Sequence, residues 1–96
     1  MKYSFHPSAI DELNDSVNYY ENCKTGLGFD FLKEVYATIQ RIIQFPGSWP
    51  KISKNTCRCL INRFPYGIIY QVLENEIVII AIMHVKRKPG YWKERK

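Results

Sequence analysis

Apolar residues recur at helical spacing in the first half of the chain and in strand-like runs in the second half. The first helix is predicted to begin at Pro7, because proline is favoured in the first turn, where its missing amide hydrogen costs nothing. Its apolar positions are three or four residues apart and therefore share one face: Ile10, Leu13, Val17 and Tyr20. Polar residues lie between them, which predicts an amphipathic helix with one exposed face.

A second helix is predicted from about Phe29 to Phe45. Gly26 and Gly28 separate it from the first helix, and the pair Pro46-Gly47 ends it. Its apolar positions fit the helical period: Phe31, Leu32, Val35, Ile39, Ile42 and Ile43. Because so short a connection leaves no other way to bury both apolar faces, we expect an antiparallel helical hairpin.

Four segments have the composition of β-strands. Lys2–Phe5 alternates polar and aromatic residues and is short, which is typical of an edge strand. The later segments are rich in β-branched and aromatic residues and are joined by short turns: Cys57–Asn62, Gly67–Leu73 and Ile77–Val85. The last of them is apolar on both faces from Ile77 to Met83, so we expect it to be the most buried strand and central in the sheet.

These elements predict an α+β fold in the order β-α-α-β-β-β, with a helical hairpin packed on one face of a twisted antiparallel sheet. The opposite face of the sheet is expected to be open. Strict alternation along the last strand would place His84 on the same face as Val78, Ile80 and Ile82.

Length and composition are those of one globular domain covering residues 1–96. The chain is 46% hydrophobic and 24% charged, which is not the composition of a disordered protein. The longest apolar run, Ile77–Met83, is far shorter than the ~20 residues that a membrane-spanning helix needs, and the N-terminus does not resemble a signal peptide. We therefore expect a soluble cytoplasmic protein that has no membrane partner.

The sequence contains no recognisable cofactor or metal motif. Its three cysteines are an odd number, and Cys57 and Cys59 would point the same way on one strand, which disfavours a disulfide framework. Cys23 is distant and no histidine is nearby, so the spacing does not match a zinc site. A glycine-rich phosphate loop is also missing, and we expect neither a metal nor a cofactor.

Positive charge is concentrated in the second half of the chain. Residues 1–48 hold four basic and six acidic side chains, whereas residues 49–96 hold ten basic and three acidic ones. Six of those ten follow His84: Lys86, Arg87, Lys88, Lys93, Arg95 and Lys96. Such a cluster attracts phosphates or an acidic protein, although a solvated tail has the same composition.

Histidine and arginine side chains are the candidates for chemistry. His84 is the one histidine near the basic cluster and has the chemistry of an acid or base, although an imidazole that caps a buried strand is the alternative. The arginines that flank the strands would bind phosphate or carboxylate if the sheet brought them together: Arg58, Arg63, Arg87 and Arg95. Four unrelated surface arginines are the alternative.

Aromatic residues accompany these basic residues. Tyr66, Tyr70, Tyr91 and Trp92 lie on or after the predicted strands. Aromatic side chains interleaved with cations stack on RNA bases, but aromatics are also the usual residues of cores and interfaces. The sequence leaves these two interpretations open.

Six stretches, in this order and spacing, resemble the RelE/ParE superfamily of bacterial type II toxins, and most closely its ParE-like branch. They read FHPSAIDEL at Phe5–Leu13, YYE at Tyr19–Glu21, GLGFDF at Gly26–Phe31, PGSWP at Pro46–Pro50, RFPYGIIY at Arg63–Tyr70 and HVKRKPGYWKER at His84–Arg95. The resemblance implies a small α+β toxin that is silenced by an antitoxin encoded beside it.

The superfamily divides by target. RelE-like members cut messenger RNA on the ribosome, whereas ParE-like members are associated with poisoning DNA gyrase and lack the nuclease residues. RelE-like toxins usually carry an arginine where this chain has Gly67, and glycine cannot stabilise the charge of a phosphate. We therefore expect a ParE-like toxin that inhibits gyrase by binding and without catalysis. A ribosome-dependent mRNA endonuclease is the alternative, and a plain nucleic-acid-binding module is a third possibility.

The resemblance also implies which residues meet each partner. The residues expected to bind the target are Arg63, Tyr70, His84, Arg87, Lys88, Tyr91, Trp92 and Arg95. If the protein is a nuclease, the catalytic candidates are His84, Arg87 and Tyr91 together with Arg63 or Arg58. An antitoxin helix or strand is expected in a groove over the hairpin and sheet, around Phe31, Val35 and Tyr36.

Overall fold

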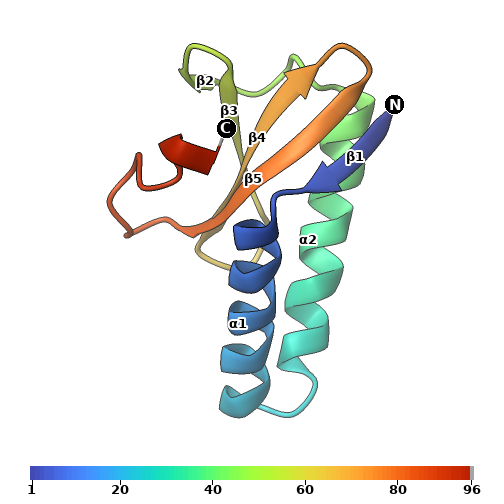
Figure 1. The fold of residues 1–96 in the computed structure, drawn as a ribbon. Helices are drawn as coiled ribbons and strands as arrows, with labels where there is room; N and C mark the ends of the chain where they lie inside the picture. Colours follow the sequence, from blue (N-terminus) through green and yellow to red (C-terminus); the bar gives the residue numbers. More distant parts are fainter. Residues whose placement is uncertain (96) are drawn as a thin grey trace.

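The computed structural model of the protein describes residues 1–95, and Figure 1 shows a helical hairpin that extends away from a twisted sheet. The elements are β1 (Lys2–Phe5), α1 (Pro7–Cys23), α2 (Leu27–Gln44), β2 (Lys51–Ser53), β3 (Thr56–Leu60), β4 (Tyr66–Leu73), β5 (Glu76–His84) and the short 3₁₀ helix η1 (Lys93–Arg95). The predicted α+β order is confirmed, with β2 as an additional short strand between the second helix and the strand predicted at Cys57–Asn62.

The sheet is mixed, with strand order β1-β5-β4-β3-β2. The strands β2 to β5 pair antiparallel, whereas β1 runs parallel to β5, with Lys2 opposite Glu76 and Phe5 opposite Ile79. The prediction gives a wholly antiparallel sheet. Because β1 runs parallel to β5, it ends beside Ile79. The helix α1, which begins at Pro7, therefore starts next to the second half of β5. The predicted central position belongs to β4, while β5 is the next strand, with β4 along one edge and β1 along the first part of the other.

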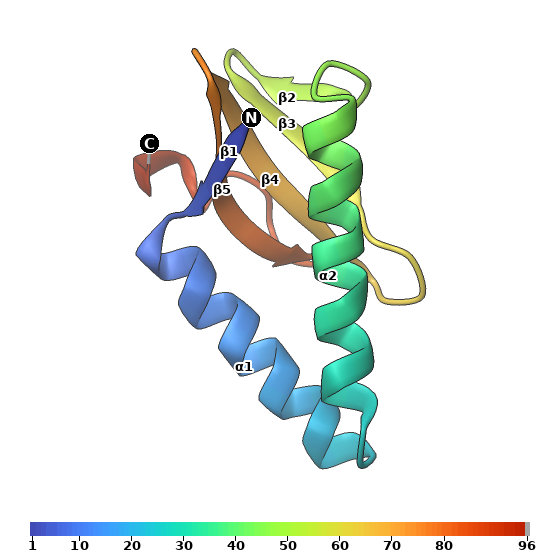
Figure 2. The same cartoon turned by 90° about the vertical axis from the view of Figure 1, so that its right-hand side faces the viewer.

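The helices cover one face of the sheet (Figure 2). From α2, the side chains of Phe31, Val35, Ile39 and Ile42 are fully buried against apolar residues of the sheet. The two helices approach closely near their connection. A Cβ atom on Gly28 would lie 2.6 Å from the carbonyl oxygen of Val17, so only glycine allows this contact.

The opposite face of the sheet is covered and is not open as the sequence predicts. Residues 85–95, here called the C-terminal segment, fold back over it on the side away from α2 (Figure 2). Trp92 is only 2% exposed and belongs to a second apolar cluster with Ile69, Ile80, Ala81 and Met83. The reason is the pattern of β5 itself, because a strand that is apolar on both faces needs cover on both.

A β-bulge interrupts the alternation of side chains along β5. Ile69 pairs with Ala81 and Tyr70 pairs with Ile79, which leaves Ile80 as the extra residue. Ile80 and Ala81 therefore both belong to the cluster under the C-terminal segment, while Ile82 joins the core under the helices. His84, two residues further on, shares a face with Ile82 and not with Ile80, contrary to the prediction from strict alternation.

Candidate functional site

Part of β5 lacks a strand neighbour. Because β1 ends opposite Ile79, the edge of β5 from Ile80 to His84 that faces away from β4 is not paired with any strand in residues 1–95. Buried backbone N–H and C=O groups need hydrogen-bond partners, and leaving one unpaired costs about 1–3 kcal/mol. Side chains supply these partners here.

Glu12 of α1 and Arg95 of the C-terminal segment together satisfy this edge. The backbone N–H of Ile82 donates to Glu12 Oε1 at 3.1 Å, and Arg95 Nη1 donates to the carbonyl oxygen of Ile80 at 3.1 Å. The two side chains also pair with each other, with Arg95 Nη1 2.7 Å from Oε1 and Nη2 3.3 Å from Oε2. The Glu12 side chain is 14% exposed and that of Arg95 is 17% exposed, so this bidentate ion pair is largely shielded from water.

Tyr91 and Arg87 complete the arrangement around the same carboxylate. The hydroxyl of Tyr91 donates to Glu12 Oε2 at 2.8 Å, and Arg87 Nη1 lies 3.6 Å from that oxygen. The Tyr91 ring contacts both guanidinium groups, with Cζ of Arg87 at 3.7 Å and Cζ of Arg95 at 5.1 Å from its centroid. We call this group the Glu12 junction: Glu12, the backbone of Ile80 and Ile82, Arg87, Tyr91 and Arg95.

The junction also affects the phenol of Tyr91. Burial raises the pKa of Tyr91 well above its ordinary value, and the hydrogen bond to Glu12 and the negative charge of that carboxylate raise it further. The charges of Arg87 and Arg95 oppose this shift without cancelling it. Tyr91 is therefore a neutral hydrogen-bond donor and not a proton acceptor at physiological pH.

His84 lies beside a small hollow next to the junction. The hollow, of about 150 Å³, is lined by Glu12, Asp15, Ser16, Tyr66, Ile82, His84 and Arg87. His84 Nδ1 accepts the backbone N–H of Lys86 at 3.0 Å, and its ring meets that of Tyr66 edge to face at 5.1 Å. The imidazole thus organises the turn that follows β5, which fits the alternative of a histidine that caps a strand.

The four predicted arginines do not converge. Arg87 and Arg95 meet at the Glu12 junction. Arg63 has a positive φ of 72° in the turn between β3 and β4, and its guanidinium lies 3.6 Å from Asp30 of α2. Arg58 lies over Gly67, where an added Cβ would be 3.3 Å from Arg58 Cγ. The residues proposed for a nuclease are therefore distributed over three places.

Two of the aromatic residues expected to bind the target are in the core. Tyr70 is fully buried and donates its hydroxyl to the carbonyl oxygen of Pro46 at 2.9 Å, and burial strongly raises its pKa. Trp92 is buried against the outer face of the sheet. Neither ring is presented to a partner in this conformation, because each fills one of the two apolar layers that β4 and β5 separate.

Exposed cations gather around the junction. Lys86, Arg87, Lys88 and Lys93 are all exposed residues of the C-terminal segment, and we call them the basic rim. Arg87 belongs to both groups, since its side chain is 55% exposed while its guanidinium contacts Tyr91 and Glu12. Arg95 instead points inward, so its charge is matched by Glu12.

The residues predicted to bind an antitoxin also divide. Phe31 and Val35 are fully buried beneath the helices, whereas Tyr36 is 38% exposed. Apolar residues of α2 are not confined to the face that packs on the sheet. The helix therefore has one buried apolar face and a second apolar face that is partly exposed. Phe29, seven residues before Tyr36, lies on that exposed face with it.

Glu12 was not predicted as a functional residue. It lies within the Phe5–Leu13 stretch, which carries part of the family resemblance, but its partner Arg95 is 83 residues away and no local pattern connects the two. Within residues 1–95, three or more histidine, cysteine or acidic side chains do not come together in a way that would hold a metal ion. In the same range, neither helix is long and apolar enough to cross a membrane.

The Glu12 junction gives a direct prediction for stability. Replacing Glu12 by Gln removes the charge that balances Arg95 in a shielded site, so we expect the free energy of unfolding to fall by roughly 2–4 kcal/mol. Urea unfolding followed by circular dichroism measures the change. We also expect faster trypsin cleavage after Lys86, Arg87 and Lys93, because the C-terminal segment loses its tie to α1.

The neighbouring acid supplies a matched control. Asp11 is exposed, and its side chain takes part in no ion pair or hydrogen bond with any other part of residues 1–95. Asp11→Asn should change the free energy of unfolding by less than about 0.5 kcal/mol. Equal effects of Asp11→Asn and Glu12→Gln would show that the junction does not stabilise the fold.

Comparison with known proteins adds an independent observation. A solved structure described as the chromosomal ParDE TA system from P. aeruginosa is similar to this one, with a TM-score of 0.79 and 16% sequence identity over 90% of this chain and 97% of that chain. At this identity the similarity shows a shared fold. No curated protein sequence matches the chain. The family model described as the ParE toxin of the type II toxin-antitoxin system, parDE, matches residues 3–89. The chain therefore belongs to the ParE toxin family.

Proposed function

We propose that this toxin inhibits DNA gyrase by binding, without catalysis, and that a cognate antitoxin in the same cytoplasm neutralises it. The observation that carries the proposal is the match to the ParE toxin family over residues 3–89. Gly67 supports the same branch, since the position where RelE-like toxins usually carry an arginine has no side chain here. The similar solved structure is itself described as a ParDE TA system, which supports an antitoxin as the partner of this chain.

The basic rim is the surface that we propose for the target. Lys86, Arg87, Lys88 and Lys93 are exposed on one short segment, and like charges so close together produce a local positive field. Gyrase bound to its substrate presents both acidic side chains and DNA phosphates. The field would steer the toxin to such a surface. Arg87, held in place by Tyr91 and Glu12, would then fix the orientation of the bound toxin.

The arrangement of the nuclease candidates favours binding over RNA cleavage. A nuclease needs cations and an acid or base directed at one scissile phosphate. Here Arg87, Tyr91 and Arg95 are directed at Glu12, and His84 Nδ1 already accepts a backbone N–H. The endonuclease remains the alternative outcome of the experiment below.

For the antitoxin we propose the partly exposed apolar face of α2. Phe29 and Tyr36 lie one above the other on this face, at the seven-residue spacing that an apolar helix or strand of a partner recognises. Phe31 and Val35 would contribute to antitoxin binding indirectly, because their buried side chains fix the position of α2 on the sheet. Covering this face would remove exposed aromatic surface from water, which is the usual source of affinity in such complexes.

The gyrase proposal predicts a charge-dependent inhibition. Purified toxin should block supercoiling by gyrase, and the double variant Lys86→Glu/Lys88→Glu should need at least about tenfold more protein for the same effect. Lys24→Glu/Lys54→Glu is the matched control, because both lysines are exposed and lie outside the basic rim. Supercoiling that is untouched by excess toxin would contradict the proposal. Primer extension that finds messages cut within codons, with the cuts lost in His84→Ala and Arg87→Ala, would establish the alternative.

The antitoxin proposal predicts a loss of affinity from α2. The double variant Phe29→Ala/Tyr36→Ala should weaken binding of the antitoxin encoded beside the toxin by about tenfold or more, as measured by isothermal titration calorimetry. Tyr19→Ala is the control, because Tyr19 is an exposed aromatic residue of the other helix. Unchanged affinity in the double variant, or an equal loss in Tyr19→Ala, would place the antitoxin elsewhere.

A further inference from the structure

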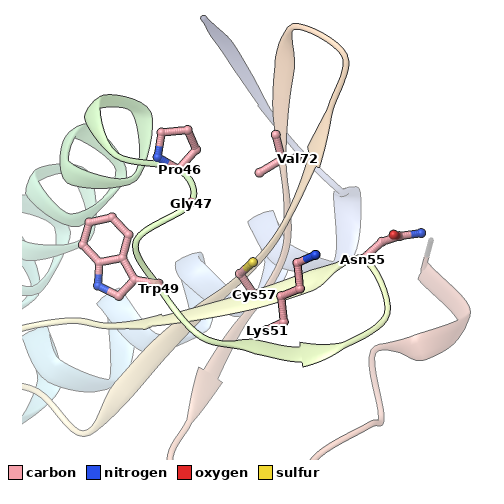
Figure 3. A pocket seen from close by; sticks show the side chains of 7 residues that line it. All are labelled: Pro46, Gly47, Trp49, Lys51, Asn55, Cys57 and Val72. Atoms are coloured by element: carbon pink, nitrogen blue, oxygen red, sulfur yellow. The ribbon is translucent and has the colours of Figure 1, made fainter.

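A pocket lies on the helix-facing side of the sheet, just beyond the end of α2. The helix ends at Gln44 because Pro46 cannot continue it, whereas β3 and β4 extend further. Figure 3 shows the space that results, with Pro46 and Trp49 on one side, Val72 on the other and Cys57 between them. Its volume is about 290 Å³.

Hydrogen bonds hold the walls of this pocket in place. The hydroxyl of Tyr70 donates to the carbonyl oxygen of Pro46 at 2.9 Å. The backbone N–H of Arg58 donates to the carbonyl oxygen of Pro50 at 3.1 Å. Cys57, whose thiol faces the space, pairs with Lys51 across the β2–β3 hairpin. The pocket is therefore formed before any ligand arrives, which lowers the cost of binding.

The lining combines an apolar interior with a positive rim. Pro46, Trp49, Cys57 and Val72 supply mainly apolar surface, whereas Lys51 and Asn55 bring an ammonium group and an amide to the edge. Among the described residues, no acidic side chain lines the pocket. Ligand pockets for drug-sized molecules begin at about 300 Å³, so this one suits a single large side chain.

We propose that this pocket binds an apolar side chain of a partner polypeptide, preferably aromatic, that has a carboxylate beside it. The apolar group would lie between Trp49 and Val72, and the carboxylate would pair with Lys51. A polypeptide is favoured over a small metabolite because exposed apolar surface continues past the pocket at Phe45, which directly precedes Pro46.

The pocket is separate from the basic rim. Val72 lies opposite Ile77 at the start of β5, whereas the basic rim follows His84 at the other end of that strand. The proposal therefore does not depend on gyrase as the target. Binding measured with a small probe and the toxin alone tests the pocket whether or not gyrase is inhibited.

The experiment compares N-acetyl-phenylalanine with its uncharged amide, N-acetyl-phenylalaninamide. The chain has two tryptophans, so the indole N–H signals in a ¹H–¹⁵N NMR spectrum report on Trp49 in the pocket and on Trp92 on the opposite face of the sheet. We expect the carboxylate to shift the Trp49 signal with a Kd on the order of 1–10 mM and to leave Trp92 unchanged. The amide should bind at least about threefold more weakly.

Three variants on exposed positions complete the test. Lys51→Gln should abolish the preference for the carboxylate over the amide, and Val72→Glu should weaken binding of the carboxylate by about tenfold or more. Leu60→Glu is the control, because Leu60 is an exposed aliphatic residue on the other face of the sheet and should bind the probe like the unchanged protein. The proposal is overturned if the Trp49 signal does not move at about 20 mM probe, if Trp92 moves equally, or if the amide binds as well as the carboxylate.

Discussion

The unpaired edge of β5 is the constraint on which the rest of the structure depends. Because β1 covers β5 only as far as Ile79, the backbone groups of Ile80 and Ile82 need other partners, and Glu12 and Arg95 supply them. One carboxylate thereby joins α1, β5 and the C-terminal segment. Without this tie, the cost of unpaired backbone groups adds to that of an isolated charge in a shielded site.

The same tie determines which charges face outward. Arg95 is turned inward and Arg87 is anchored through the ring of Tyr91, while Lys86, Lys88 and Lys93 remain exposed. Fixing the C-terminal segment also seats Trp92 on the second face of the sheet, so that β5 is buried on both sides. The family match ends at residue 89, before Tyr91 and Arg95, whereas Glu12 and Arg87 lie within it. Half of the junction's side chains are thus outside the part of the chain that matches the family.

Periodicity predicted the helices and the long strands, because those patterns are local. The interactions that build the site are not local. The parallel pairing of β1, the bulge at Ile80 and the contact between Glu12 and Arg95 depend on residues up to 83 positions apart. The burial of Tyr70 and Trp92 was not predicted for a similar reason. Tyrosine and tryptophan occur both in cores and on binding surfaces, so only the packing shows that these two side chains are buried.

Amide hydrogen exchange at Ile82 tests this account most directly. The structure pairs the Ile82 N–H with Glu12, so its exchange should be slow in the unchanged protein and about 100-fold faster in Glu12→Ala. Amides that pair β5 with β4 should keep their protection in the same variant, since their partners are untouched. If Ile82 exchanges equally fast in both proteins, Glu12 does not close the edge of β5 and the central claim is wrong.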